Sequence, residues 1–429
     1  MEERKGAREY PSDAAVLHGV EAAAGRESAR QRNLVFGIIN LSHLFNHLES
    51  SVVAVLYPVM MGEMGFGYFA LGVLQMIYQM TAMGFQALYG LLARFLPRSI
   101  LLGMGNVVLG LFVMATGLAQ NFTQVALLRG LARVGSSVQH PVGSAILISY
   151  FEKARGRVLT LHHSVGNLGA FLAPAIAGGM LLFTSWRTVF YVVALPSIVM
   201  GLSYFFLRDA VVDAGESKRE RVVASLHDYL ACIKNRDVML VSMIQMVGAA
   251  GRGTGINVAF LTAFFMTAMG VDVTVAAGLL MLYQLSGLVG PLAIGWLSDR
   301  FNRKWILQLT LLSSTMATLW LLVHSSLTPW LILNIVLYGS VIQARGSLTQ
   351  SMVSEAVPLE QMDVAFSLYF LIGFISGPAW TFLMGWLIDA YGFGVAFKVI
   401  SVSYLLGMLM MFFAKRPALG DPSPRSGPF

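Results

Sequence analysis

Long apolar segments dominate this chain and limit what it can fold into. Each of twelve stretches is apolar over about 20 residues, the length of helix that crosses a hydrocarbon layer of about 30 Å. They lie near residues 34–60, 68–92, 99–119, 124–151, 158–183, 188–207, 238–267, 273–297, 305–324, 329–353, 364–389 and 393–414. Because lipid offers a backbone no hydrogen-bond partners, such segments form helices. The sequence therefore predicts an all-α membrane protein with twelve transmembrane helices.

The composition excludes an ordinary soluble protein. Hydrophobic residues make up 56% of the chain and charged residues 12%, against about 45–50% and about 25% in soluble domains. The net charge is +7, but most of the 29 Lys and Arg lie in the tails, the alternate loops and the central linker, which argues against nucleic acid as a partner. By the positive-inside rule we expect a multi-pass protein of the plasma membrane, here a bacterial inner membrane, with both termini in the cytoplasm.

The longest polar interval divides the chain into two halves of six spans. We expect a cytoplasmic tail at 1–33, a six-helix bundle at 34–207, a cytoplasmic linker at 208–237, a second six-helix bundle at 238–414 and a cytoplasmic tail at 415–429. Within the linker, the segment "SLHDYLACIKNR" has apolar residues at helical spacing on one side. This pattern predicts an amphipathic helix on the membrane surface.

The two halves also repeat each other. The segment "MIYQMTAMGFQALYG" in the second span aligns without gaps with "MLYQLSGLVGPLAIG" in the eighth, and "GSSVQ" in the fourth span aligns with "GSVIQ" in the tenth. Gly169 and Pro174 in the fifth span align with Gly373 and Pro378 in the eleventh at nearly the same interval. Two bundles related by such a repeat commonly enclose a substrate site near the bilayer midplane.

These motifs resemble those of the major facilitator superfamily over residues 34–414. The loop "GWLSDRFNRK", from Gly295 to Lys304, is similar to the superfamily's Gly-x-x-x-Asp-Arg-x-Gly-Arg-Arg/Lys motif, with Asn302 at a position where Gly is usual. In the first half only Gly90 and Arg98 match this motif. The segments "HLFNH", "YQMTA" and "GSSVQHP" resemble the fosmidomycin-resistance branch of drug exporters.

The resemblance implies a gate and a set of packing residues. We assign the cytoplasmic gate to Gly90, Arg98, Gly295, Asp299, Arg300 and Arg303. An acid beside a helix end and basic neighbours can join the two halves in one state and release them in another. The glycines and prolines of the fifth and eleventh spans permit bends and close helix contacts: Gly169, Pro174, Gly178, Gly373, Gly377 and Pro378.

Charged residues inside the spans mark the candidate substrate site. A charge at mid-bilayer costs about 2.5–3.5 kcal/mol on insertion scales, so each one needs a partner or a watery cavity. Glu49 lies in the first span, Arg129 and Arg133 in the fourth, Arg252 in the seventh and Arg345 in the tenth. The resemblance implies that these four spans line the central cavity. Polar residues that share helix faces with them complete the expected substrate-binding or coupling set: His43, Asn46, His47, His140, Asn334 and Tyr338.

Several of these residues have two interpretations at this point. Glu49 could carry a proton, because burial opposes charge on a carboxyl and a neighbouring Arg restores it, or it could form a static ion pair. Arg129 could be structural, and Arg252 lies in "GAAGRGTG", where glycines allow close packing or unwinding. The histidines could relay protons or be satisfied structurally.

The function that we expect is secondary active transport by alternating access. Cationic side chains outnumber the one deep acid, which favours a small anionic or zwitterionic organic solute, moved most simply by proton-coupled efflux. Proton-coupled anion uptake is the alternative, and a membrane enzyme or sensor on a transporter scaffold is a third class. The sequence has no ATP-binding loop, zinc motif or nucleophile elbow, so we expect no cofactor and no metal. The partners that we expect are the bilayer, the solute and protons, and we expect the protein to be a monomer.

Overall fold

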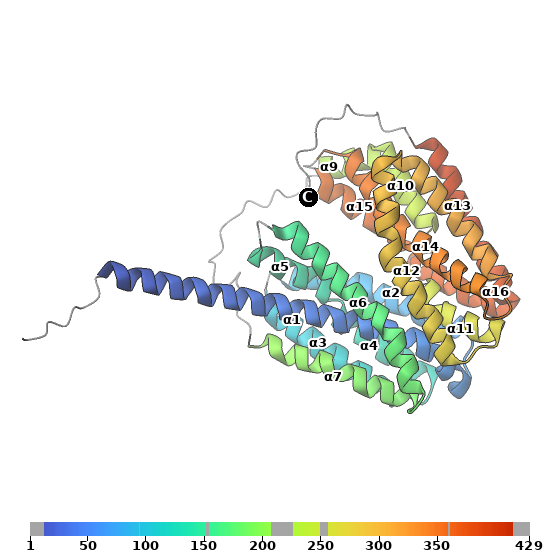
Figure 1. Ribbon diagram of the computed structural model, residues 1–429, viewed down its shortest axis with the longest axis horizontal. Helices are drawn as coiled ribbons and strands as arrows, with labels where there is room; N and C mark the ends of the chain where they lie inside the picture. The colour runs from blue at the N-terminus through green and yellow to red at the C-terminus, as the bar shows by residue number, and fades with distance from the viewer. Residues whose placement is uncertain are drawn as a thin grey trace, which may run out of the picture.

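The computed structural model is helical throughout the part of the chain that it describes. The described residues are 13–93, 95–151, 154–206, 226–248, 256–358 and 361–414. Figure 1 shows two helical bundles that converge at one end and diverge at the other. We call the side where α1 enters and η5 ends the terminal side, and the opposite side the distal side.

The first bundle holds six spans. The fourth span consists of three consecutive helical pieces, whereas each of the others is one continuous helix. The elements are α1 (Asp13–Met64), α2 (Tyr68–Leu92), α3 (Arg98–Thr116), α4 (Phe122–Ser136), η1 (Gln139–Gly143), α5 (Ser144–Tyr150), α6 (Arg155–Leu181) and α7 (Trp186–Tyr204). Helix α1 begins in the segment that the sequence predicts as a tail, because "EAAAGRESARQR" is rich in strong helix formers.

The second bundle also holds six spans. The elements are α9 (Leu226–Lys234), α10 (Arg236–Val247), α11 (Ile256–Met269), α12 (Val273–Arg300), α13 (Arg303–Leu321), α14 (Pro329–Ala356), α15 (Met362–Ile375), α16 (Gly377–Met410) and η5 (Met411–Phe413). The seventh span is α10 with α11, and the eleventh is α15 with the first part of α16. The predicted twelve-helix fold is confirmed, although within the described ranges only seven helical stretches are each long and apolar enough to be recognised as spans by length and composition.

Helix breaks occur where the backbone chemistry requires them. Pro141 lacks an N–H, and the fourth span passes through the π-helical turn η1 at this point. Gly392 adopts a φ of 79°, which favours glycine, and it separates the eleventh span from the twelfth within α16. Pro378 stands in the first turn of α16, whereas its repeat partner Pro174 lies inside the continuous helix α6.

The linker helix α9 has an apolar face that is not covered by the protein. Tyr229, Leu230 and Ile233 are exposed, whereas Cys232 is buried in a cluster with Val238 of α10 and with α14 and α15. One side of α9 therefore packs on the second bundle, and the apolar side is free to lie on a membrane surface. Residues 208–225 of the predicted linker lie outside the described residues.

Small residues let the two bundles approach closely at two crossings. A Cβ added to Gly72 of α2 would lie 2.7 Å from the carbonyl oxygen of Thr381 and 3.1 Å from Cα of Gly385, both in α16. A Cβ added to Gly178 of α6 would lie 2.7 Å from Cβ of Ala277 in α12. The pairs α2–α16 and α6–α12 thus join the bundles through backbone contact, as small residues do between membrane helices.

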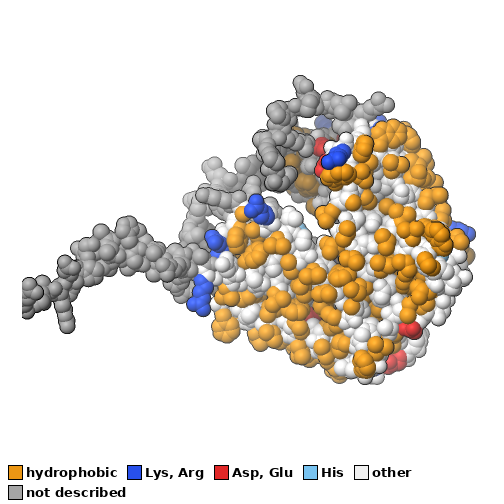
Figure 2. Space-filling model, viewed as in Figure 1, with side chains coloured by type: hydrophobic (Ala, Val, Ile, Leu, Met, Phe, Trp, Pro, Cys, Tyr) orange, Lys and Arg blue, Asp and Glu red, His pale blue; other side chains and the backbone are white. Residues whose placement is uncertain are grey.

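The apolar core shows on which side the bundles are closed. One large cluster combines α1, α2 and α7 of the first bundle with α11, α12 and α16 of the second. The other clusters lie at the terminal side and each belongs to one bundle only. Figure 2 shows a notch between the bundles on that side and a broad hydrophobic surface on the face in view. The structure is therefore closed distally and open on the terminal side.

Gly72→Val should loosen the contact between α2 and α16. The new side chain meets backbone atoms that cannot rotate away, so we expect a loss of about 1–3 kcal/mol, the usual effect of overpacking. Gly84→Val on the same helix is the matched control, because no atom lies within 4 Å of an added Cβ there. Thermal unfolding in detergent should give a lower midpoint for Gly72→Val than for Gly84→Val; equal midpoints would contradict the contact.

Candidate functional site

Glu49 and Arg129 form a buried charged centre in the first bundle. Glu49, on α1, has no exposed surface, and neither carboxylate oxygen makes a hydrogen bond of normal distance and angle among the described residues, although the Ser197 hydroxyl of α7 is a polar neighbour. Arg129, on α4, is 2% exposed, and its charge acts on Glu49. Its guanidinium carbon lies 5.5 Å from the ring centroid of Tyr78 and 5.9 Å from that of Phe190. This acid is therefore held near a cation without a fixed hydrogen bond.

Arg133 lies one helical turn further along α4 and is partly exposed. Its guanidinium carbon lies 4.5 Å from the Tyr78 ring centroid, and its Nη1 donates hydrogen bonds to the Tyr78 hydroxyl at 3.4 Å and to Ser136 Oγ at 3.1 Å. The Tyr78 hydroxyl donates in turn to Ser50 Oγ of α1 at 3.0 Å. Tyr78 thus links the arginines of α4 to the helix that carries Glu49.

The predicted polar residues of α1 point at α4 and α6. The amide of Asn46 donates to the carbonyl oxygen of Ser136 at 3.1 Å. The rings of His43, His47 and His140 lie close together, with centroid separations between 4.6 and 5.6 Å. Of the predicted site residues, the structure therefore brings together all those of the first bundle, on α1, α4 and η1.

Arg345 of α14 lies inside the second bundle. It is 2% exposed, its guanidinium carbon is 5.5 Å from the ring centroid of Tyr404, and a Cβ on Gly248 would lie 2.7 Å from its Nη1. Tyr283, Tyr338 and Tyr369 are its other aromatic neighbours. The guanidinium thus lies beside the Tyr404 ring with further tyrosines nearby, and neither its Nε nor its Nη1 has a hydrogen-bond partner among the described residues.

The other predicted residues of α14 contact helices of their own bundle, Asn334 on α13 and Tyr338 on α12. With its amide oriented to suit its neighbours, Asn334 donates to the carbonyl oxygen of Ala317 at 3.1 Å and accepts from the backbone N–H of Leu321 at 2.9 Å. Tyr338 is 1% exposed and packs on Tyr283, with a ring centroid separation of 5.5 Å. Arg252, the remaining predicted cation, lies outside the described residues.

The predicted gate makes its contacts within the second bundle. Arg303 Nη2 lies 2.5 Å from Asp299 Oδ1 and 3.4 Å from a carboxylate oxygen of Glu355 at the end of α14. The Arg300 guanidinium lies 3.9 Å from the Trp296 ring centroid. These charges are satisfied without the first bundle, in keeping with the open terminal side. Asn302, at the unusual position of the motif, caps α13 by accepting from the Lys304 N–H at 3.0 Å.

The gate glycines and the packing glycines have different surroundings. Added Cβ atoms on Gly90 and Gly295 would meet nothing within 4 Å, and Arg98 begins α3. The packing positions instead abut other helices. An added Cβ on Gly169 of α6 would collide with the backbone of Leu44, one on Gly373 would lie 2.7 Å from Cγ of Gln245, and one on Gly377 would lie 2.6 Å from Oε1 of Gln79 in the other bundle.

Asp389 closes the distal side and had no sequence signal. Its Oδ1 accepts from the N–H of Tyr68 at 2.9 Å and its Oδ2 from the N–H of Phe69 at 2.7 Å. These are the first N–H groups of α2, whose own N-cap residue, Gly67, offers no side-chain hydrogen bond. A carboxylate of the second bundle therefore caps a helix of the first, in a position favoured by the helix dipole.

A second distal contact involves Arg187, a basic residue on that side. Arg187, at the start of α7, forms an ion pair with Glu63 at the end of α1, and the Trp186 Nε1–H donates to the same carboxylate at 2.6 Å. Arg187 Nη2 also donates to the carbonyl oxygen of Ala119 at 3.1 Å. This cluster belongs to the first bundle alone and does not hold the two bundles together.

Sequence reasoning missed Tyr78, Glu355 and Asp389 as site or gate residues. Tyr78 had a signal, because it belongs to the repeated Tyr-Gln pair of the second and eighth spans, but helical spacing does not reveal that it packs on Arg129 and Arg133. Glu355 and Asp389 stand at helix ends, where acids are common, and only the packing of the helices shows which groups they meet.

The fold and these sites define a class of protein. Two matched membrane bundles, closed against each other on one side, open on the other and each holding buried charges, have the architecture of a membrane transport protein. The family model of the Major Facilitator Superfamily matches residues 39–381 and 241–428. The chain therefore belongs to the major facilitator superfamily and is a multi-pass transporter of small solutes rather than an enzyme.

Similar proteins agree with this assignment. The fosmidomycin resistance protein of Escherichia coli (strain K12) is 24% identical over 405 residues, which cover 91% of this chain and 95% of that protein. A probable L-galactonate transporter of the same organism is 23% identical over 406 residues, 88% of each chain. The predicted superfamily and the resemblance to the fosmidomycin-resistance proteins are thus confirmed.

A solved structure supports the fold. A bacterial homologue of the human lysosomal transporter Spinster, in an inward-facing and unoccupied conformation, is similar to this chain with a TM-score of 0.69. Its sequence identity is 17%, and the match covers 89% of this chain and 95% of that one. At this identity the likeness concerns the fold alone.

Asp389→Ala should shift the protein toward a state that is open distally. Loss of a capping side chain costs about 1 kcal/mol, which corresponds to about a fivefold change in the ratio of the two states. Asp272→Ala is the matched control, because Asp272 caps its own helix α12, and the N–H groups of Val275 and Thr274 hold the pKa of its carboxyl below the usual range.

The measurement is the distance distribution between spin labels at Leu118→Cys and Leu327→Cys, two exposed distal positions in different bundles. Cys232 stays in place, because it is buried. Asp389→Ala should add a population with longer distances, whereas Asp272→Ala should not. Identical distributions in the two variants would contradict the interdomain role of Asp389.

Proposed function

We propose that this transporter moves a small anionic or zwitterionic organic solute by proton-coupled efflux. The observation that carries the proposal is the buried Glu49 carboxyl, which makes no hydrogen bond of normal distance and angle among the described residues and lies near Arg129. A buried acid without a fixed partner can gain or lose a proton as the charge beside it changes. Glu49 is therefore assigned as the proton carrier, in preference to a static ion pair.

Arg133 is assigned as the main solute contact. It is partly exposed, unlike Arg129, and its guanidinium rests on the Tyr78 ring with Nη1 already engaged by Tyr78 and Ser136. A carboxylate or phosphonate would find there a planar donor set suited to two parallel hydrogen bonds. Tyr78, Asn46 and Ser50 would define the orientation of the solute through the same network.

Arg345 is assigned as the cation of the second bundle. In this conformation it is buried beside the Tyr404 ring, so its contact with solute requires a different arrangement of α10 and α14 from the one described. Asn334 positions α14 against α13, and Tyr338 positions it against α12. The two bundles would thus contribute unequally, with the proton and the first solute contacts both in the first bundle.

The orientation follows from the positive-inside rule. The basic tails and alternate loops lie on the terminal side, which we assign to the cytoplasm of a bacterial cell, with the protein in the inner membrane and working as a monomer. The described conformation is then open to the cytoplasm. The gate residues Asp299, Arg300 and Arg303, with Glu355, would contact the first bundle only when this side closes.

Uptake by anion–proton symport is a second candidate, and a specific observation favours it. Glu49 and an anionic solute would compete for the same arginines, so binding of the anion would leave Glu49 without its cation and promote its protonation. Solute and proton would then travel together. The likeness to a probable L-galactonate transporter points the same way, whereas the likeness to a fosmidomycin resistance protein favours efflux.

The sign of the coupled proton movement distinguishes the two candidates. Proteoliposomes with a pH-sensitive dye in the lumen would receive a phosphonate such as fosmidomycin, or a sugar acid such as L-galactonate, on the outside. Exchange predicts that the lumen becomes alkaline as the solute enters, and symport predicts that it becomes acidic. A lumenal pH that does not change, while radiolabelled solute enters, would overturn proton coupling in either direction.

Glu49→Gln should separate transport from the proton gradient. Because the amide cannot exchange a proton, accumulation driven by a pH gradient should be lost, while exchange of labelled for unlabelled solute continues. Glu63→Gln is the matched control on the same helix, where the acid belongs to the distal Arg187 cluster. Gradient-driven uptake that survives Glu49→Gln would contradict the assignment of the proton carrier.

Arg133→Ala should weaken solute binding by about 10- to 100-fold, because a hydrogen bond to a charged group contributes about that much to affinity. Arg133→Lys should restore part of the affinity, since it keeps the charge and loses the planar fork. Arg187→Ala, a distal cation outside the proposed site, is the control. Binding is measured by scintillation proximity with labelled solute. If Arg133→Ala and Arg345→Ala both leave affinity and transport unchanged, the assignment of the cationic site fails.

A further inference from the structure

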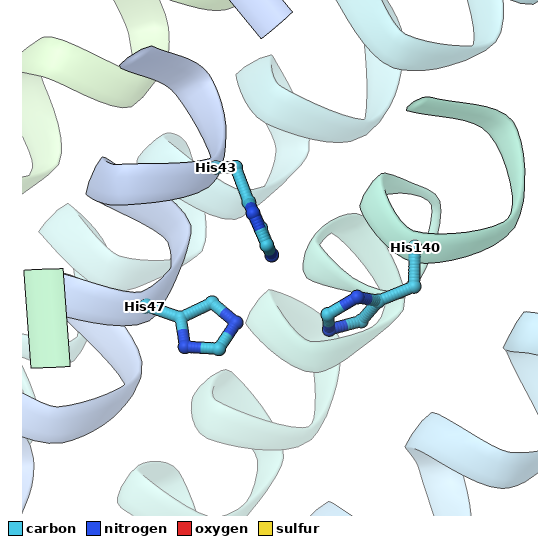
Figure 3. Close-up of side chains that lie close together, drawn as sticks. All are labelled: His43, His47 and His140. Atoms are coloured by element: carbon cyan, nitrogen blue, oxygen red, sulfur yellow. The ribbon is translucent and has the colours of Figure 1, made fainter. Parts of the chain in front are cut away.

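Three histidines from two separate parts of the chain converge inside the first bundle. His43 and His47 come from α1 and His140 from η1, and Figure 3 shows their imidazoles directed at a common space. One ring nitrogen from each can be chosen so that the three lie within 4.8 Å of one another. This is the one such group of His, Cys, Asp and Glu found among the described residues.

The local backbone explains the convergence. His43 and His47 are four residues apart on one helix, so their side chains lie on the same face, one turn apart. His140 stands in the π-helical turn next to Pro141, and such turns redirect side chains and occur often at functional sites. Gly166 of α6 leaves room for the His43 ring, because an added Cβ would lie 2.7 Å from Cε1 of that ring.

The hydrogen bonds of His43 prepare it as a ligand. Its Nδ1 lies 2.9 Å from the carbonyl oxygen of His162, and because a carbonyl only accepts, Nδ1 carries the hydrogen. The other nitrogen, Nε2, therefore holds a lone pair. It is buried, has no partner among the described residues, and belongs to a side chain with no exposed surface. A histidine that donates through one nitrogen to a carbonyl and binds through the other is the usual arrangement in metal sites.

The donor set selects the kind of ion. Three neutral imidazoles suit a divalent transition metal such as Zn²⁺, which prefers nitrogen ligands at about 2.0–2.1 Å, whereas Mg²⁺ and Ca²⁺ prefer oxygen. In a tetrahedral site of that size the ligand nitrogens are about 3.4 Å apart. The three nitrogens lie within 4.8 Å of one another, so rotations of the side chains that move each nitrogen by about 1 Å would bring them to that distance.

We propose that His43, His47 and His140 bind one divalent transition-metal ion of the Zn²⁺ class, with its fourth coordination position left to water or an anionic ligand. The three imidazoles carry no negative charge, and Arg133 lies two turns before His140 in the same span, so an anion as the fourth ligand would offset the charge of the ion. His163 is exposed, with its ring centroid 6.2 Å from that of His43 and 6.4 Å from that of His140, and marks the approach from α6.

The test is metal binding by the purified full-length protein, prepared with an affinity tag that contains no histidine. After removal of metals with a chelator, the protein is titrated with Zn²⁺ by calorimetry, and separately with Co²⁺, whose visible absorption is strong in tetrahedral sites and weak in octahedral ones. The wild type should bind one equivalent of Zn²⁺ and show the strong cobalt absorption. Bound Zn²⁺ should also raise the thermal unfolding midpoint, because a ligand of the native state stabilises it.

Two kinds of variant make the result specific. His47→Gln and His140→Gln keep the size of the side chain and should weaken Zn²⁺ binding by more than about 100-fold, beyond the loss seen for mere orienting partners. His324 lies outside the cluster, so the control variant His324→Gln should bind Zn²⁺ like the wild type. Unfolding midpoints without metal show whether each variant is folded.

The proposal is overturned if the folded wild type binds no more Zn²⁺ than His47→Gln, or if its bound Co²⁺ shows only the weak octahedral absorption. Those outcomes would leave the three histidines as a proton relay or as hydrogen-bonding partners of a solute. Neither outcome bears on the transport assays, which are made with metal-free protein, so failure of the metal site is distinguishable from failure of the proposed function.

Discussion

The whole structure depends on the absence of hydrogen-bond partners in lipid. Each backbone N–H and C=O must be satisfied within its own helix, so the chain can cross the membrane only as helices. Because lipid tails are as apolar as leucine, the hydrophobic effect does not hold these helices together, and close contact must. Gly72 against Gly385 and Gly178 against Ala277 supply that contact between the bundles, where larger side chains would separate the backbones.

Those contacts leave the molecule with one closed side and one open side. On the distal side a shared apolar core and the Asp389 cap join the bundles, and on the terminal side each bundle keeps its own core. The two sides contain similar parts, since each has a carboxylate near a helix end. Asp389 reaches across to the other bundle, whereas Asp299 is held by Arg303 within its own. A carrier needs one side closed while the other is open. If both sides were closed the solute could not move, and if both were open it would leak through.

The two halves share a repeat but not a chemistry. The first bundle contains the buried acid, two arginines and the three histidines, all on α1, α4 and η1, whereas the described part of the second holds Arg345 among tyrosines. How far the sequence could predict this differs between the residues. Charge and span position were enough to select Glu49 and Arg133, but Asn334 and Tyr338 share a face with Arg345 and still contact α13 and α12 of their own bundle. Helical spacing defines a face and not the neighbour that the face meets.

By itself, the sequence determined the class of fold, the number of spans, the division into halves and which charged residues lie inside spans. Apolar length, repeat and charge are properties of single segments, and each segment meets the lipid independently of the others. The tertiary structure alone decided which side is open, which acid reaches which helix end, and that His43, His47 and His140 meet. These features depend on contacts between residues that are distant in the chain, and their partners are set by how whole helices pack.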